Sequence, residues 1–304
     1  MKKGNTLVVA VIYEGVKQYL SEYFNAINNQ DTDCFNILLL IDNVKYLKLP
    51  NTSIDCKEIV FNKKRSPARI RSDAISYARD NHYEYLIFSD MDDFFSTNRI
   101  SASVENLQKN DFVFNELDLV DQDSQIIEPK LLSKIYHSDK ILNFSEIIDF
   151  NILGLTHTAL NVNVLEGFKN VEGIAAFDWW LFTTLLLNGA EGIFIKEAIT
   201  YYRQTDSNTV GMMKDLDTDR LRFGIGVKMD HYGKVCEYCK LSQLSEGFEA
   251  YSKKYEEMKE LETKLVNKKF MMDYIDIINH NFDQIFKGWW SEILTLNQWS
   301  KYAK

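Results

Sequence analysis

The sequence predicts an α/β fold, with a mostly parallel sheet flanked by helices and followed by a helical C-terminal appendage. Short apolar runs rich in β-branched residues recur over the first ninety residues, a pattern typical of strands covered on both faces. Helical segments separate these runs, which favours strand–helix–strand units and therefore parallel pairing. From about residue 213 the pattern is mostly helical. We therefore expect one domain over residues 1–212 and a helical region over 213–304.

The first strand–helix–strand unit is predicted from residue 6 to residue 42. The run TLVVAVIY at 6–13 has the composition of a buried strand. After Gly15, apolar residues recur at helical spacing as far as Ile27. A second buried strand, FNILLLID, then ends at Asp42.

A second unit follows the same pattern and ends in acidic residues. KEIVF at 57–61 predicts a short strand, and SPARIRSDAISYARDN predicts a helix that begins at Ser66 and Pro67. YEYLIFSD at 83–90 predicts a further buried strand. Ligands of open α/β sheets bind beyond the carboxyl ends of the strands, where Asp42 and Asp90 are expected.

The remaining segments predict elements at the edge of this sheet and beyond it. DFVFNELDLVD at 111–121 alternates in part, which predicts a strand that can pair antiparallel with the sheet. AAFDWWLFTTLLLNG predicts an apolar helix that ends at Asn188 and Gly189. Two short strand-like pieces follow in GIFIKEAITYYRQ, and the charged stretch 252–269 predicts a solvated helix face or a short antiparallel helix pair.

Composition restricts the class of protein. The formal charge of -9 argues against a general nucleic-acid binder, because neutralising phosphates requires a basic face. No apolar segment has the length of a bilayer span, and the run after Lys3 is too short for a secretory signal, so we expect a cytoplasmic protein. The Cys236–Cys239 pair has no second pair with which to form a structural zinc site.

Three carboxylates lie within four positions at the end of the strand predicted at 83–90. Asp90, Asp92 and Asp93 repel one another, so a metal ion, a basic ligand or full solvation has to stabilise them. A calcium-binding EF-hand loop does not fit, because Phe95 and Ser101 occupy the positions that require glycine and glutamate. A solvated acidic turn and a magnesium or manganese site are the remaining interpretations.

Several motifs in one order resemble those of a known enzyme family. The βαβ start, the ARIR helix, SDMDDFF, FDWWLFTTLLLNG and YYRQTDSNTVG together resemble a family 2 glycosyltransferase of the GT-A fold, which is Rossmann-like, over roughly residues 6–212. The resemblance implies transfer of a sugar, with inversion, from a nucleotide-diphospho sugar, with a UDP-sugar favoured. It implies a glycan or lipid-linked acceptor and a role in surface polysaccharide synthesis.

The same resemblance implies roles for the acidic residues. Asp92 matches the ligand of Mn²⁺ or Mg²⁺, Asp90 is a second ligand nearer the sugar or ribose, and Asp93 is a third candidate. A cation at this position stabilises the negative charge that develops on the departing diphosphate.

Further donor-binding residues are implied on neighbouring segments. Asp42 matches the residue that hydrogen-bonds the nucleobase, Tyr13 flanks that base, and Arg69 matches an arginine near the diphosphate. Arginine suits this role because its planar fork can bind two phosphate oxygens at once. Alternatively, Asp42 caps a turn and the arginines of this helix form surface ion pairs.

The later motifs supply the remaining candidates. Asp178 matches the general base that takes the acceptor proton, with Glu172 as the alternative, and Asp178 can also cap the helix that it precedes. Arg203, Gln204 and Asn208 resemble a segment on a loop that closes over the diphosphate, where Thr205 replaces the family's histidine.

Two other functions and several roles of the C-terminal region stay open at this stage. A sugar nucleotidyltransferase would share the sheet and the metal, although the glycine-rich phosphate loop is missing after the first strand. A non-catalytic binding protein on the same fold is the other alternative. The tryptophan-rich segment 288–304 is consistent with an interfacial helix at a membrane, with core packing or with a homodimer contact.

Overall fold

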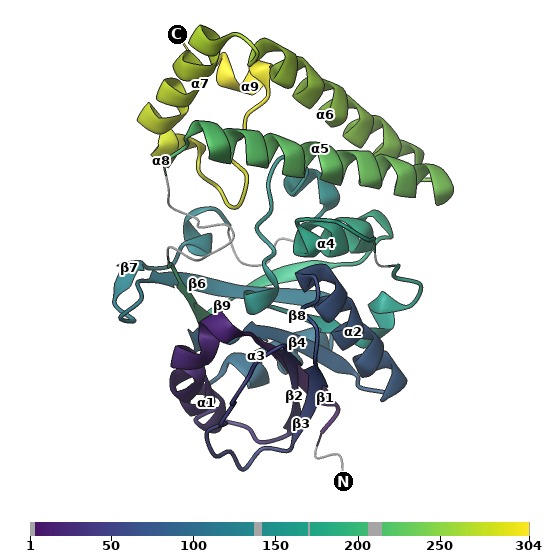
Figure 1. Cartoon of the computed structure of the whole chain (residues 1–304). Helices are drawn as coiled ribbons and strands as arrows, with labels where there is room; N and C mark the ends of the chain where they lie inside the picture. The colour runs from purple at the N-terminus through teal and green to yellow at the C-terminus, as the bar shows by residue number, and fades with distance from the viewer. Residues whose placement is uncertain (1–3, 137–141, 170, 206–214, 304) are drawn as a thin grey trace. The chain divides into compact units, whose positions relative to one another are not determined.

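The computed structural model describes residues 4–136, 142–169, 171–205 and 215–303 (Figure 1). The chain forms two compact units, of which the first comprises residues 1–142, 153–173 and 189–207. The second unit comprises 143–152, 174–188 and 208–304. The helical unit thus includes two segments from the middle of the chain, whereas the sequence predicts only residues after 212.

One mixed sheet forms the centre of the first unit, as predicted. Its strand order among the described residues is β3-β2-β1-β4-β8-β6-β9-β5, with β7 paired to β6. The strands are β1 (Thr6–Ile12), β2 (Phe35–Asp42), β3 (Cys56–Phe61), β4 (Tyr85–Asp90), β5 (Phe94–Phe95), β6 (Phe112–Val120), β7 (Ile126–Glu128), β8 (Thr158–Asn161) and β9 (Gly192–Arg203). β3, β2, β1 and β4 are parallel, which confirms the expected strand–helix–strand units.

The register of the parallel strands brings their carboxyl ends together. Val11 of β1 lies opposite Asp90 of β4, and Ile12 lies opposite Ile41 of β2. Asp42 and the residues after Asp90 therefore leave the sheet at the same edge as the end of β1.

The second half of the sheet is built around β6 and β9. β6 pairs antiparallel with β8, as its alternation predicts, and parallel with β9. The register shifts so that Asn115 lies opposite Ile195 while Glu116 lies opposite Ile199. The two strand-like pieces expected after residue 191 are thus halves of one strand, interrupted by a bulge.

Helices cover this sheet and contribute to its core. The helical elements of the first unit are η1 (Glu14–Tyr19), α1 (Leu20–Asn28), α2 (Pro67–Asp80), α3 (Arg99–Leu107), η2 (Leu132–Lys134), η4 (Leu155–His157) and η5 (Val162–Leu165). The Ser66 hydroxyl accepts the Arg69 amide at 3.3 Å, which confirms the expected start of α2. Tyr23 and Phe24 of α1 are buried with Val8 and Ile37 of the central strands.

The second unit is helical, with α5 and α6 adjacent in sequence and in contact (Figure 1). Its elements are η3 (Phe144–Glu146), α4 (Phe177–Leu187), α5 (Thr218–Leu241), α6 (Ser245–Lys264), α7 (Lys268–His280), α8 (Phe282–Ile285) and α9 (Leu296–Trp299). Cys236 and Cys239 lie within α5 and are free thiols. The charged stretch 252–269 lies mostly in α6 and ends at the first two residues of α7, and most of its side chains are exposed or half-buried, which fits the solvated helix face among the two expected alternatives.

The C-terminal tryptophans pack within the helical unit. Trp289 and Trp290 are buried, and Trp299 stacks on Tyr274 with ring centroids 5.9 Å apart. Within the described residues 288–303 of this segment, only Leu296–Trp299 is helical. The aromatic residues are therefore accounted for by core packing. No helix in the described part of the chain is both long enough and apolar enough to span a bilayer.

Candidate active site

The turn after β4 is held in place by Asp93. Its side chain is only 2% exposed. Asp93 Oδ1 accepts the Arg203 amide at 2.8 Å, and Oδ2 accepts the Thr156 hydroxyl at 2.6 Å. The same hydroxyl accepts the Asp90 amide at 3.3 Å. Both oxygens of Asp93 thus bind protein donors, and we call residues 90–93 the acidic turn.

Asp90 and Asp92 are the more accessible carboxylates of the acidic turn. The Asp90 side chain is 32% exposed, and Nη2 of Arg71 lies 3.8 Å from its Oδ1. Burial and then the charge of Asp90 raise the pKa of Asp92 to about 6. Burial, followed by the charges of Asp92 and Asp90, raises the pKa of Asp93 well above its ordinary value. The negative charge of the turn is therefore incompletely compensated by the protein.

This arrangement fits a hard divalent cation. Carboxylate oxygens are the ligands that Mn²⁺ and Mg²⁺ prefer, and a cation would offset the burial and the charge of Asp90 that together raise the pKa of Asp92. Among the described residues, no group of three or more His, Cys, Asp and Glu side chains forms a complete metal site. One or two carboxylates suffice for these ions, because water and substrate phosphates supply the remaining ligands.

Tyr13 and Asp42 lie at the same edge of the sheet as the acidic turn. Tyr13 directly follows β1 and is 45% exposed. Burial, then the charges of Asp92 and Asp90, raise the pKa of its hydroxyl, so the phenol is neutral near those carboxylates. Asp42 is 8% exposed, and its Oδ1 accepts the Arg65 amide at 3.1 Å. This bond matches the turn-capping alternative. It uses Oδ1, so Oδ2 is the oxygen that would accept from a nucleobase.

The arginines of α2 and the preceding loop have different surroundings. Arg69 is 61% exposed and its Nε pairs with Asp73 at 3.1 Å, while Arg65 pairs with the same carboxylate and stacks 3.9 Å from the centre of the Phe61 ring. Arg71 instead approaches Asp90. The sequence selects Arg69 by its match to the family, and the structure adds Arg71 as the arginine of α2 that pairs with the acidic turn.

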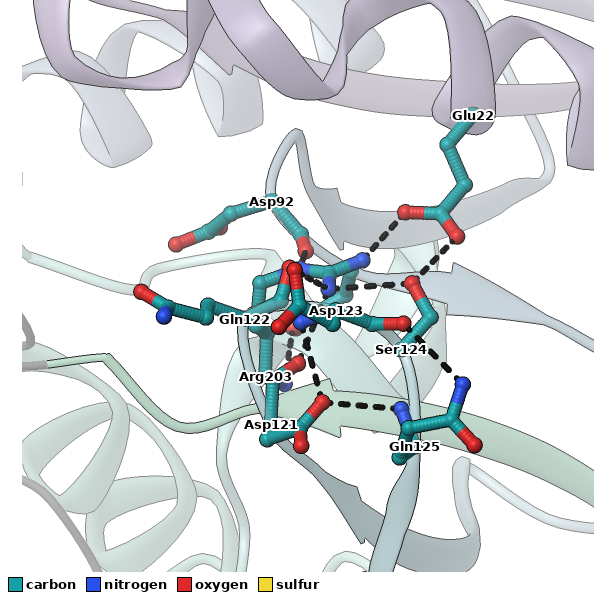
Figure 2. Close-up of polar contacts among 9 residues, drawn as sticks. Glu22, Asp92, Asp121, Gln122, Asp123, Ser124, Gln125 and Arg203 are labelled. Carbon is teal, nitrogen blue, oxygen red and sulfur yellow. Dashed lines mark hydrogen bonds and ion pairs between the residues drawn. The ribbon is translucent and has the colours of Figure 1, made fainter.

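Arg203 lies next to the acidic turn, and its guanidinium is hydrogen-bonded to other residues of the chain (Figure 2). Its side chain is fully buried. The guanidinium donates to the backbone carbonyls of Asp92, Asp121 and Gln122, and to side-chain oxygens of Ser124 and Glu22. Arg203 therefore joins segments of the fold, whereas the family resemblance implies a loop residue that faces the diphosphate. The backbone amide of Gln204 donates to the Val120 carbonyl at 2.8 Å. Asn208 lies outside the described residues.

The acceptor-side candidates differ in their local environment. Asp178 is the second residue of α4 in the helical unit, half-buried, with its Oδ1 accepting the Trp179 amide at 2.8 Å. The residue before the helix is Ala176, so Asp178 lies in the first turn and does not act as the N-cap. Glu172 is exposed. It belongs to the first unit and precedes α4 in sequence. The assignment of either residue as the base stays a prediction.

Solved structures of low sequence identity share the fold of this chain. TarS of S. aureus, residues 1–349 in complex with UDP-GlcNAc, matches with a TM-score of 0.52 and 14% identity over 75% of this chain and 66% of that one. TarS of S. aureus itself matches with a TM-score of 0.54 over 84% of this chain and 55% of that one. The mannosyltransferase PcManGT from Pyrobaculum calidifontis, in complex with GDP-Man and Mn²⁺, has 12% identity and a TM-score of 0.50. That match covers 83% of this chain and 74% of the PcManGT chain.

These similarities confirm the GT-A-like fold that the motifs predict, and the chain spans 66% and 55% of the two TarS chains. No curated protein sequence matches this chain. Residues 6–158, half of the sequence, match the family described as Glycosyl transferase family 2. That range contains Tyr13, Asp42 and the acidic turn. The chain belongs to glycosyl transferase family 2.

Proposed function

We propose that this protein is an enzyme that transfers a sugar, with inversion, from a nucleotide-diphospho sugar to a hydroxyl of a glycan or lipid-linked acceptor. The observation that carries the proposal is the acidic turn, where Asp90 and Asp92 stand at the binding edge of the sheet while Asp93 holds the backbone. Family membership supports it, and it disfavours a sugar nucleotidyltransferase and a non-catalytic binding protein. TarS was solved with UDP-GlcNAc and PcManGT with GDP-Man and Mn²⁺.

The proposed donor site is formed by the first unit. Asp42 accepts a hydrogen bond from the nucleobase and Tyr13 flanks it, with a UDP-sugar favoured. Arg71 and Arg69 are the cations that approach the diphosphate from α2. Asp92 and Asp90 hold Mn²⁺ or Mg²⁺, which, when bound, stabilises the charge on the departing nucleoside diphosphate.

In the proposed transfer step the acceptor hydroxyl oxygen attacks the anomeric carbon of the sugar. Its proton passes to the Asp178 carboxylate, with Glu172 as the alternative base. The bond between the anomeric carbon and the diphosphate oxygen breaks, and its electron pair leaves with the nucleoside diphosphate. Attack from the side opposite the leaving group inverts the anomeric configuration.

The biological setting is part of the same proposal. The family resemblance supports a role in surface polysaccharide synthesis on the cytoplasmic side of the membrane, where lipid-linked acceptors are accessible. The buried Trp289 and Trp290 do not provide an exposed apolar face for that contact. A peripheral contact or a homodimer would therefore have to use other residues.

The proposal is tested by measuring nucleoside diphosphate release from a panel of UDP- and GDP-sugars, with MnCl₂ and with EDTA. We expect release from one nucleotide class, stimulated by acceptor glycans and abolished by EDTA. Equal release with EDTA would contradict metal dependence. Conversion of the donor with release of pyrophosphate would support the nucleotidyltransferase instead.

A further inference from the structure

The Arg203 guanidinium is a buried charge surrounded by acceptors from distant parts of the chain. Its Nε donates to the Asp92 carbonyl at 2.8 Å. Its Nη1 donates to the carbonyls of Asp121 and Gln122 at 2.9 and 3.0 Å and to Ser124 Oγ at 3.1 Å. Its Nη2 pairs with Glu22. Each of the three guanidinium nitrogens thus donates to an oxygen atom of the protein (Figure 2).

Glu22 of α1 supplies the opposite charge, 181 residues away in sequence. Its other oxygen, Oε1, accepts the Ser124 hydroxyl at 2.6 Å, so Ser124 bonds both members of the pair. The Tyr19 ring lies 4.5 Å from the guanidinium carbon of Arg203 and adds a cation–π contact. A charge as buried as that of Arg203 is strongly destabilising when its partner is removed, so Glu22 is needed to keep Arg203 in this position.

The pair reaches the acidic turn at two points. The Arg203 side chain binds the Asp92 carbonyl, and the Arg203 amide binds the Asp93 carboxylate at 2.8 Å. These bonds connect the end of β9 to the Asp92 carbonyl and to the side chain of Asp93, the residue that follows it. A shift of Arg203 would therefore move the Asp92 side chain, whose position has to match a metal and a diphosphate within a fraction of an ångström.

We propose that Glu22 and Arg203 form a positioning pair, which fixes the Asp92 carboxylate for metal-dependent nucleotide binding without touching the nucleotide. The role of the acidic turn in that binding rests on the proposed function. Nothing in the family resemblance singles out Glu22. If Arg203 instead bound the diphosphate directly, replacing it would weaken nucleotide binding whether or not Glu22 was present. In a positioning pair, the loss of binding on replacing Arg203 depends on Glu22.

A double-mutant cycle separates the two roles. Glu22→Gln, Arg203→Lys and the double variant are titrated with UDP and GDP, with and without MnCl₂. A positioning pair predicts that each single variant weakens manganese-dependent binding by about tenfold, and that the double variant is no weaker than Arg203→Lys alone. Binding of the same nucleotide without manganese changes less than twofold. If Arg203 bound phosphate directly, Arg203→Lys would weaken binding with and without manganese and Glu22→Gln would leave it unchanged.

Amide hydrogen exchange tests the pair even when neither nucleotide binds. Peptides that cover residues 90–93 and 121–125 should exchange faster in Glu22→Gln and in Arg203→Lys than in the wild type. Ile27→Val is the matched control, because it loosens the buried face of the same helix α1 without touching the pair. Unchanged exchange at 90–93 in both pair variants would overturn the proposal. Should the wild type bind neither nucleotide while exchange responds as expected, the donor site would be wrong and the positioning contact right.

Ser124→Ala provides a milder variant if Arg203→Lys does not fold. It removes the hydroxyl that bonds both Glu22 and Arg203 and leaves both charges in place. We expect an increase in exchange at 90–93 that is smaller than in Glu22→Gln. No increase in Ser124→Ala together with none in Glu22→Gln would again overturn the proposal.

Discussion

The Thr156 hydroxyl donates a hydrogen bond to Asp93 Oδ2 at 2.6 Å and accepts the Asp90 amide at 3.3 Å. One side chain from η4 therefore binds both ends of the acidic turn. The two donors on Asp93, from Thr156 and Arg203, leave Asp90 and Asp92 as the carboxylates available to a ligand. These contacts give the three neighbouring acids different roles: Asp93 holds the turn, and Asp90 and Asp92 stay available to a ligand.

Thr156→Val should lower stability and nucleotide binding together. The substitution keeps the shape of the side chain and leaves a buried Asp93 oxygen without its donor, which costs about 1–3 kcal/mol. Urea unfolding followed by circular dichroism measures the stability, and calorimetry with manganese measures the binding. Thr156→Ser keeps the hydroxyl and should retain most of both. Equal values for Thr156→Val and the wild type would show that this bond does not hold the turn.

Arg71→Ala and Arg69→Ala should differ in their effect on nucleotide binding. Arg71 approaches Asp90, whereas Arg69 is mostly exposed and paired with Asp73. A charge-assisted contact to the diphosphate is worth about 1.5–3 kcal/mol, so Arg71→Ala should weaken binding about tenfold or more. Arg69→Ala should stay within about threefold of the wild type, as expected for an exposed ion pair. A larger loss for Arg69→Ala would restore the assignment made from the sequence.

Asp178→Asn should separate donor binding from transfer. Removing a general base slows the chemical step by about 10²–10⁴-fold, while the nucleotide affinity of the first unit should be unaffected. Nucleoside diphosphate release in the presence of acceptor measures the rate, and calorimetry measures the affinity. Transfer at the normal rate in Asp178→Asn would make Glu172→Gln the next variant.

The stability of the helical unit should fall in mild acid because of His231. Burial, followed by the charges of Lys228 and Lys234, lowers the pKa of His231 to about 3, and its ring stacks on Trp179 at 4.0 Å. The unfolded chain takes up a proton near pH 6.5 that the folded chain does not, so the stabilisation is present above pH 6.5 and is lost as the pH falls toward 3.

Between pH 7 and pH 5 this group should cost about 2 kcal/mol of unfolding free energy. Urea unfolding followed by tryptophan fluorescence reports on this unit, because all five tryptophans belong to it. His231→Phe keeps a ring against Trp179 and removes the titration, so its stability should fall less over the same range. An equal pH dependence of the variant and the wild type would exclude His231 as the cause.

Local sequence signals predicted most of the first unit. β2 has the predicted bounds, Phe35–Asp42, and α2 begins where Ser66 and Pro67 indicate. The sequence analysis does not predict α3. Asn98, at its N-cap position, makes no capping bond to this helix and donates its side-chain amide to the Glu197 carbonyl. The sequence carries no sign of contacts that depend on tertiary structure.

Long-range contacts account for most of what the sequence could not predict at the site. The Glu22–Arg203 pair joins residues 181 positions apart, so no spacing rule can find it. The choice between Arg69 and Arg71 depends on which side of α2 faces the acidic turn, which is set by packing against the sheet. The motif match located the acidic turn but could not assign separate roles to its three carboxylates.

The most direct test of the central claim is calorimetric titration of UDP and GDP, with and without MnCl₂, into the wild type, Asp92→Ala and Glu105→Ala. Glu105 is an exposed residue of α3 and serves as the control for loss of a carboxylate. We predict manganese-dependent binding of one nucleotide that is lost in Asp92→Ala and kept in Glu105→Ala. Unaltered binding by Asp92→Ala, or binding of neither nucleotide by the wild type with manganese, would contradict the proposed donor site.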